Sequence, residues 1–185
     1  TPAEPIGVIL YTQQAFADIT RAPGWVGALN DGRIRVPVQG LTSVSSELSR
    51  ILKHELTHSF IQQKTRGRCP VWLQEGVAQW MEGQRSGDNA AVLVEAYDRK
   101  LSAPLGALEG SWMNLQDSQA AYAYAWSLAV VEYIVQGSGL RDVSRMLDRI
   151  AGGSAAEAAA QEILRMDYSD LEQGTIAYIR QTYLH

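Results

Sequence analysis

The sequence predicts an α+β fold in which a small N-terminal β-sheet precedes a mainly helical body. The strand signals fall in the first forty residues. IGVILY (6–11) is a short β-rich run, and RIRVPV (33–38) alternates charged and apolar residues directly after the turn signal NDG (30–32). Because Pro37 has no N–H to donate to a sheet ladder, we expect residues 33–38 to form an edge strand.

After residue 42 the sequence favours helices. The first, 45–64, starts at serines suited to capping and meets no helix breaker before Gly67. The second follows Pro70 and stops at Gly83. The last follows Ser169 with Glu172 three residues on, the pattern of a capping box. The second to seventh helices are expected at 71–82, 89–101, 118–135, 140–150, 155–165 and 170–184.

Length and composition are those of one ordinary globular domain. The chain has 185 residues, of which 46% are hydrophobic and 19% charged, enough to bury a core without disulfides. Its one cysteine, Cys69, excludes an internal disulfide and a cysteine-rich metal site. A net charge of −4 gives no electrostatic reason to expect nucleic acid as a partner. We expect neither a membrane span nor a signal peptide in this chain, and the oligomeric state is left open.

Residues 54–58 read HELTH, and the chain contains one other histidine, His185. On an α-helix, His54 and His58 lie about 40° apart around the axis and about 6 Å apart along it, so both imidazoles can reach one ion. Glu55 lies about 60° from His58 on the same side, close enough to act on a water bound to that ion. The five-residue pattern H-E-x-x-H often occurs by chance in proteins that bind no metal. The alternative to a metal site is therefore a pair of histidines at a helix edge whose ring nitrogens are satisfied by hydrogen bonds.

The helix around HELTH favours the metal interpretation. Its apolar residues are spread around most of its circumference, as in an interior helix. Histidine and glutamate are costly to bury without partners, which indicates a metal ion or a tight polar network. A catalytic zinc needs three protein ligands and a water. His185 lies too near the chain end to be a good third ligand, and Glu75 in WLQEGVAQW is the better candidate.

The spacing of the two helices supports Glu75. His58 lies roughly 9 Å before the end of the first helix, and Glu75 lies roughly 6 Å after the start of the second. Antiparallel neighbouring helices therefore bring the two residues to similar height. The alternative is that Glu75 is a plain surface residue, but the residues that flank it are largely apolar.

HELTH, followed seventeen residues after His58 by the glutamate of PVWLQEGVAQW, resembles the gluzincin group of zinc metallopeptidases. The resemblance is closest to the bacterial peptidase MA-like domains, and it extends to YAWSLAVVEYIV (124–135) and to residues 146–172. It covers most of residues 25–180. It implies a zincin-like fold for residues 1–185 as a single metallopeptidase domain, which we expect to be excised from a longer, extracytoplasmic (periplasmic or secreted) protein.

The resemblance also implies one Zn²⁺ per chain, with His54, His58 and Glu75 as ligands and Glu55 as general base. The helix geometry leads to the same four residues. The expected substrate is a peptide or protein. The expected reaction is hydrolysis by a metal-activated water, with an endopeptidase preferred over an exopeptidase. The alternatives are a non-catalytic, peptidase-like binding module that retains the fold, and a helical interaction protein without metal.

Other site residues rest on the resemblance. Tyr124 matches a tyrosine of the similar domains and is expected to stabilise the oxyanion, with Tyr122 second, although tyrosines in such helices are most often packing residues. Gln79 stands where a thermolysin-like enzyme has an aspartate that orients a ligand histidine, and its amide oxygen could accept the same imidazole N–H.

The segment GWVGALND (24–31) lies where related enzymes have the substrate-binding strand. We expect the backbone of Gly27, Ala28 and Leu29 to pair with an extended peptide. Asn30 stands at the place of the amine-binding glutamate of aminopeptidases. This difference argues against an exopeptidase, while the neighbouring Asp31 keeps that alternative open.

Overall fold

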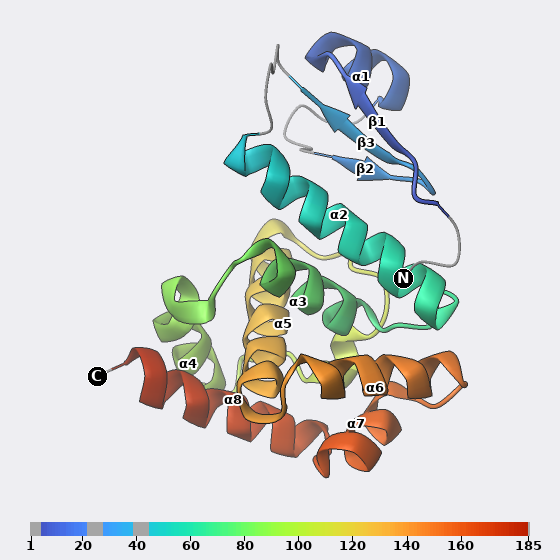
Figure 1. The fold of residues 1–185 in the computed structure, drawn as a ribbon. Coiled ribbons are helices and arrows are strands. Elements are labelled where there is room, and N and C mark those ends of the chain that lie inside the picture. The colour runs from blue at the N-terminus through green and yellow to red at the C-terminus, as the bar shows by residue number, and fades with distance from the viewer. Residues whose placement is uncertain (1–4, 22–27, 39–44, 185) are drawn as a thin grey trace.

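The computed structural model describes residues 5–21, 28–38 and 45–184. A small sheet lies at one end of the molecule and a helical body at the other, with α2 between them (Figure 1). The α+β prediction is confirmed. The described elements are β1 (Val8–Tyr11), α1 (Gln13–Thr20), β2 (Leu29–Asn30), β3 (Ile34–Pro37), α2 (Ser46–Thr65), α3 (Val71–Glu82), α4 (Ala90–Asp98), α5 (Asp117–Ser138), α6 (Leu140–Ala151), α7 (Ala156–Leu164) and α8 (Tyr168–Tyr183), with short 3-10 helices at Ser86–Asn89 and Leu105–Leu108.

The sheet corrects the prediction of an edge strand at residues 33–38. The strand order is β1-β3-β2, so β3 is central, parallel to β1 and antiparallel to β2. Pro37 is tolerated there because β2 pairs only with Ile34 and Arg35, and Pro37 lies beyond it. On the other side, the ladder bond to Tyr11 O comes from the N–H of Val38, so the sheet needs no donor from Pro37.

The predicted helices are present in the described residues, with small shifts at their ends. α2 begins after Ser45, whose side chain accepts the N–H of Leu48, and α3 ends at Gly83, which adopts a φ of 101°. The capping box of α8 is formed by Asp167 and Asp170 rather than by Ser169 and Glu172. These two aspartates satisfy the same pattern two residues earlier. The Glu172 carboxylate instead accepts the N–H of Leu105.

One helix was not expected. α1 follows β1 directly, and Thr12 caps it by accepting the N–H of Ala15. The helix has only eight residues and its one buried side chain is Phe16. A segment this short has too few apolar repeats to show a helical period in the sequence.

The larger core lies in the helical body, where Trp72 of α3 and Trp126 of α5 are fully buried. Gly76 lets these two helices approach closely, because a Cβ at this position would lie 2.3 Å from the carbonyl oxygen of Ser127. The sheet has a separate cluster whose buried residues are Ile34, Val36 and Leu48. No helix in the described part of the chain has the length and hydrophobicity that a membrane span requires.

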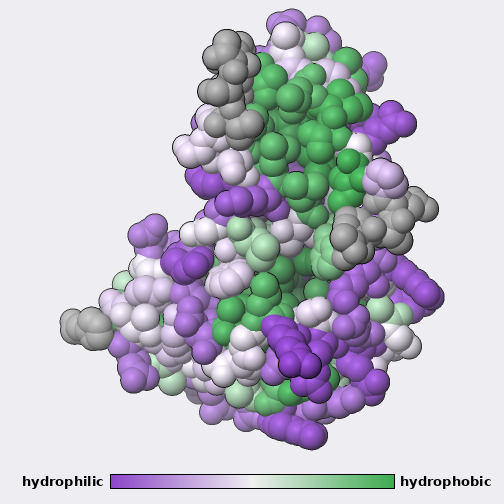
Figure 2. All heavy atoms as spheres, viewed as in Figure 1, coloured by the Kyte–Doolittle hydropathy of each residue, from purple (hydrophilic) through white to green (hydrophobic). Residues whose placement is uncertain are grey.

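The sheet end of the molecule also exposes apolar surface. Figure 2 shows hydrophobic residues gathered over this region. Val8 and Leu10 of β1 are 42% and 55% exposed. The small sheet therefore buries only part of its apolar side chains within the described residues.

Candidate metal centre

The site is built on α2 and α3, which a short connection joins. α2 ends where Arg66 adopts a left-handed conformation, and α3 begins after Pro70. His58 lies near Glu75, and His54, one turn earlier on α2, lies near Glu82, two turns later on α3. The two helices are therefore antiparallel neighbours, as the spacing predicts.

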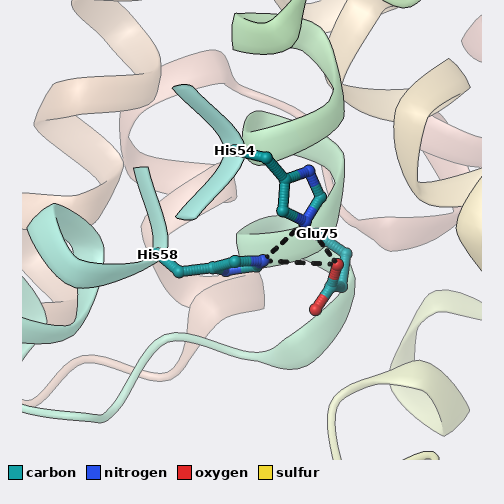
Figure 3. A group of neighbouring side chains, drawn as sticks. All are labelled: His54, His58 and Glu75. Carbon is teal, nitrogen blue, oxygen red and sulfur yellow. Dashed lines mark hydrogen bonds and ion pairs between the residues drawn. The ribbon is translucent and has the colours of Figure 1, made fainter. Parts of the chain in front are cut away.

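His54, His58 and Glu75 converge on one point (Figure 3). The two histidine Nε2 atoms are 2.9 Å apart. The Glu75 Oε2 atom lies 3.8 Å from His54 Nε2 and 3.6 Å from His58 Nε2. Ligand atoms about 2.1 Å from one tetrahedral ion lie roughly 3.4 Å from each other. The three side chains thus fit a divalent cation, with one position left for a water or a substrate atom.

Burial of this cluster has a consequence for its charges. Burial lowers the pKa of His54 and, together with the His54 charge, lowers the pKa of His58 to about 4. Burial and the nearby Glu55 raise the pKa of Glu75 to about 7. The neutral imidazole is the form that binds a metal, and a cation would offset the cost of a buried carboxylate. Both histidine Nδ1 atoms and Glu75 Oε2 are buried without a hydrogen bond to the described residues.

Glu55 lies beside the cluster without belonging to it. It directly follows the candidate ligand His54 in the chain, and its charge raises the pKa of both Glu75 and Tyr124. Burial, reinforced by Glu82, raises the pKa of Glu55 itself. A carboxylate with a raised pKa is a stronger base, as general-base chemistry near neutral pH requires.

Of the two candidate tyrosines, Tyr124 faces the site. It lines a cavity of about 770 Å³ together with Glu75 and Trp112, and its ring packs edge-on against Trp112 at 5.1 Å. Burial, followed by the charges of Glu75 and Glu55, raises its pKa. Tyr122 instead stacks on the buried Trp126 at 6.4 Å and packs against the core of the body.

Gln79 does not occupy the place expected for it. Its side-chain nitrogen donates to the backbone oxygens of Glu75 and Tyr124 at 3.2 and 3.0 Å, tying α3 to α5. The carboxylate beside a ligand imidazole is Glu82, whose Oε2 lies 3.5 Å from His54 Nδ1. The sequence contained a signal for Glu82, because residues seven apart share one face of a helix.

The predicted substrate segment is partly described. Gly27 lies outside the described residues, Ala28 packs partly buried against the sheet cluster, and Leu29 belongs to β2. The next residue, Asn30, donates from its side chain to α2. Asn30 and Glu75 also line a second cavity of about 640 Å³. Glu75 therefore borders both cavities, and His58 borders the second.

A small sheet beside a helix pair that carries HELTH and a downstream glutamate is the arrangement of a gluzincin-like peptidase domain. The family model of the peptidase MA superfamily matches residues 1–181. The chain therefore belongs to the peptidase MA superfamily and is a peptidase-like protein. No curated protein and no solved structure matches the chain.

Proposed function

We propose that this protein is a zinc-dependent peptidase, and specifically an endopeptidase. The observation that carries the proposal is the convergence of one ligand atom each from His54, His58 and Glu75 within 4.8 Å, with Glu55 beside them. Two histidines and a glutamate are a ligand set of catalytic zinc sites, which keep a further position open for water.

Each residue of the site has a chemical role in this proposal. His54, His58 and Glu75 hold the ion, which when bound supplies Lewis-acid activation of a water and of the scissile carbonyl. Glu55 accepts a proton from the attacking water and later donates it to the departing amine. Tyr124 donates a hydrogen bond to the developing oxyanion, and its raised pKa keeps the phenol protonated at neutral pH.

Two features support an endopeptidase. Two cavities have Glu75 in their lining, so an extended chain has space to lie beside the cluster. An aminopeptidase needs an acidic group for the substrate amine, but Asn30 is neutral and its amide is bonded to α2. Asp31 is paired with Arg35 at 3.0 Å, and this contact holds the pKa of the Asp31 carboxyl below its usual value.

β2 is the strand to which a substrate would add. Within the described ranges it pairs with β3 on one side only and so forms an edge of the sheet. An edge strand presents unpaired backbone groups, and an extended peptide can bind them as an additional strand. β2 also contacts α2, so a peptide along it would lie near the cluster.

The experiment that tests the proposal is Glu55→Gln, compared with the wild type at equal zinc content. Glutamine is nearly isosteric but cannot accept the proton, so cleavage of casein or of a mixed peptide library should fall by about 10²- to 10⁴-fold while zinc is retained. Glu47→Gln is the matched control, because Glu47 is an exposed glutamate in the first turn of the same helix. It should leave the rate unchanged.

Two results would contradict the enzyme assignment. Equal cleavage by Glu55→Gln and the wild type would indicate another base or a contaminating protease. No cleavage by the zinc-loaded wild type over a broad library would instead support the non-catalytic binding module. The metal content of protein purified without chelator or metal-affinity resin distinguishes the peptidase and the zinc-retaining binding module from the third alternative, a helical interaction protein without metal.

A further inference from the structure

Asn30 joins the edge of the sheet to the helix that carries HELTH. Its Nδ2 donates to Ser59 Oγ at 2.8 Å and to the backbone oxygen of Glu55 at 3.2 Å. Its Oδ1 accepts the N–H of Gly32 at 3.4 Å, in the turn between β2 and β3. Glu55 and Ser59 are about one helical turn apart. One amide therefore bonds the same turn of α2 that contains the general base and His58.

We infer that Asn30 is a positioning residue that fixes β2 relative to the catalytic turn of α2, an inference that rests on the proposed function. A peptide paired with β2 takes its position from that strand. Glu55 and the ligand cluster take theirs from α2. The Asn30 bonds thus set the placement of the scissile carbonyl relative to the groups that act on it.

The strand has few other means of holding this position. β2 has only two residues, and within the described residues it pairs with β3 alone. In the part of the chain that the structure describes, the apolar cluster beneath the sheet has three buried residues. A misplacement of reacting groups by about 1 Å can lower a rate by about 10²-fold. Loss of the two hydrogen bonds from Asn30 could therefore lower the rate by displacing the strand.

Asn30→Asp isolates this role. The substitution keeps the size of the side chain and the acceptor for Gly32, but it removes the donor to the Glu55 backbone oxygen, and it leaves the Ser59 hydroxyl to donate where it had accepted. It also places a carboxylate opposite the backbone oxygen of Glu55, and this like-polarity contact is repulsive. The strand is expected to shift without a cavity being created. Asn89→Asp is the matched control, because Asn89 is exposed and makes no side-chain capping bond.

The experiment compares kcat/KM at equal zinc content for long peptides and for N-acetylated dipeptide amides. The short amides cannot pair along β2, and they carry no free amine that an acid at position 30 could bind. Asn30→Asp should lower kcat/KM for the long peptides by roughly tenfold to a hundredfold and leave that for the short amides within about threefold. Ser59→Ala removes one of the two acceptors of the Asn30 amide, so it should give a smaller loss for the long peptides. Equal losses on both substrates, or no loss, would overturn the inference.

A second readout does not require activity. Amide hydrogen exchange should become faster in residues 28–36 of Asn30→Asp and stay unchanged in residues 54–58, because the strand is released and the helix is not. Unchanged exchange in residues 28–36 would refute the anchoring role. If the zinc-loaded wild type cleaves neither substrate, the proposed function fails, and the exchange pattern alone decides whether Asn30 anchors the strand.

Discussion

The helical body and the sheet differ sharply in how much core each one has. Among the described residues, the cluster in the body contains 26 buried residues, whereas that of the sheet contains three, Ile34, Val36 and Leu48. Glu75 lies on α3, whose residues Trp72 and Leu73 are buried in the larger core. The strand expected to bind substrate lies in the layer with the smaller core. The residues proposed to bind the metal and the substrate therefore lie in regions with unequal amounts of buried core.

α2 takes part in both regions. Leu48, near its start, is buried in the sheet cluster, and Ile61, near its end, is buried in the core of the body. The two ligand histidines lie between these positions. Changes in the body should therefore affect the ion first, whereas changes in the sheet should affect the substrate first.

The largest expected effect is loss of the ion. His54→Ala, His58→Ala and Glu75→Ala each remove one of three ligand atoms, and each should weaken zinc binding by more than about a hundredfold, beyond what loss of an outer partner costs. Glu82→Ala removes such an outer partner beside His54 and should weaken binding only by about 10- to 100-fold. Competition with a chromogenic chelator measures both. If zinc binding were unaltered in all three ligand variants, the site would lie elsewhere.

The next effect separates the two tyrosines. Tyr124→Phe should lower kcat by roughly tenfold to a thousandfold with zinc content and fold intact, because it removes one donor to the oxyanion. Tyr122→Phe should leave kcat nearly unchanged, since that ring stacks on Trp126 in the body. Steady-state kinetics on a common peptide compares the two. A large loss for Tyr122→Phe with none for Tyr124→Phe would reverse their roles.

A stability effect follows at the contact between α3 and α5. Gly76→Ala should lower the free energy of unfolding by about 1–3 kcal/mol, because the new methyl group would meet the Ser127 backbone oxygen and the Val131 side chain. Gly137→Ala is the matched control in α5, where a Cβ would meet nothing within 4 Å. It should stabilise the protein by up to about 1 kcal/mol. Urea denaturation measures both, and equal effects of the two substitutions would contradict the close packing.

The features predicted well from the sequence are those that local geometry determines. The bounds of α3 follow from Pro70 and Gly83, and the helical repeat places His54 and His58 on one face. The approach of Glu75 follows from antiparallel packing of two helices that a short turn joins. In this part of the chain, local sequence and tertiary structure agree.

The errors fall where pairing over a distance decides the outcome. The central place of β3 depends on β1, more than twenty residues earlier in the chain, and Pro37 alone gave no information about that partner. Glu82 shares a helix face with Glu75, but its distance from His54 depends on how far α3 is rotated against α2. The aromatic lining around Tyr124 likewise requires knowledge of how α5 packs.

The smallest expected effect tests the sheet itself, at two neighbouring positions of paired strands. Leu10 of β1 pairs in register with Val36 of β3, yet Leu10 is 55% exposed and Val36 is fully buried. Leu10→Thr keeps a good strand former at an exposed site and should change the free energy of unfolding by no more than about 0.5 kcal/mol.

Val36→Ala provides the contrast. It removes two methyl groups from the three-residue cluster and should cost about 1–3 kcal/mol. Urea denaturation followed by tryptophan fluorescence, in a Trp25→Phe background, reports on the body, because the other four tryptophans, Trp72, Trp80, Trp112 and Trp126, lie in its core or pack against it. Hydrogen exchange in residues 8–11 and 34–36 reports on the sheet. If the sheet unfolds separately from the body, Val36→Ala should accelerate exchange in those strands and leave the fluorescence transition unchanged. A fluorescence midpoint lowered together with that exchange would show that the two regions unfold as one unit, despite the inequality of their cores.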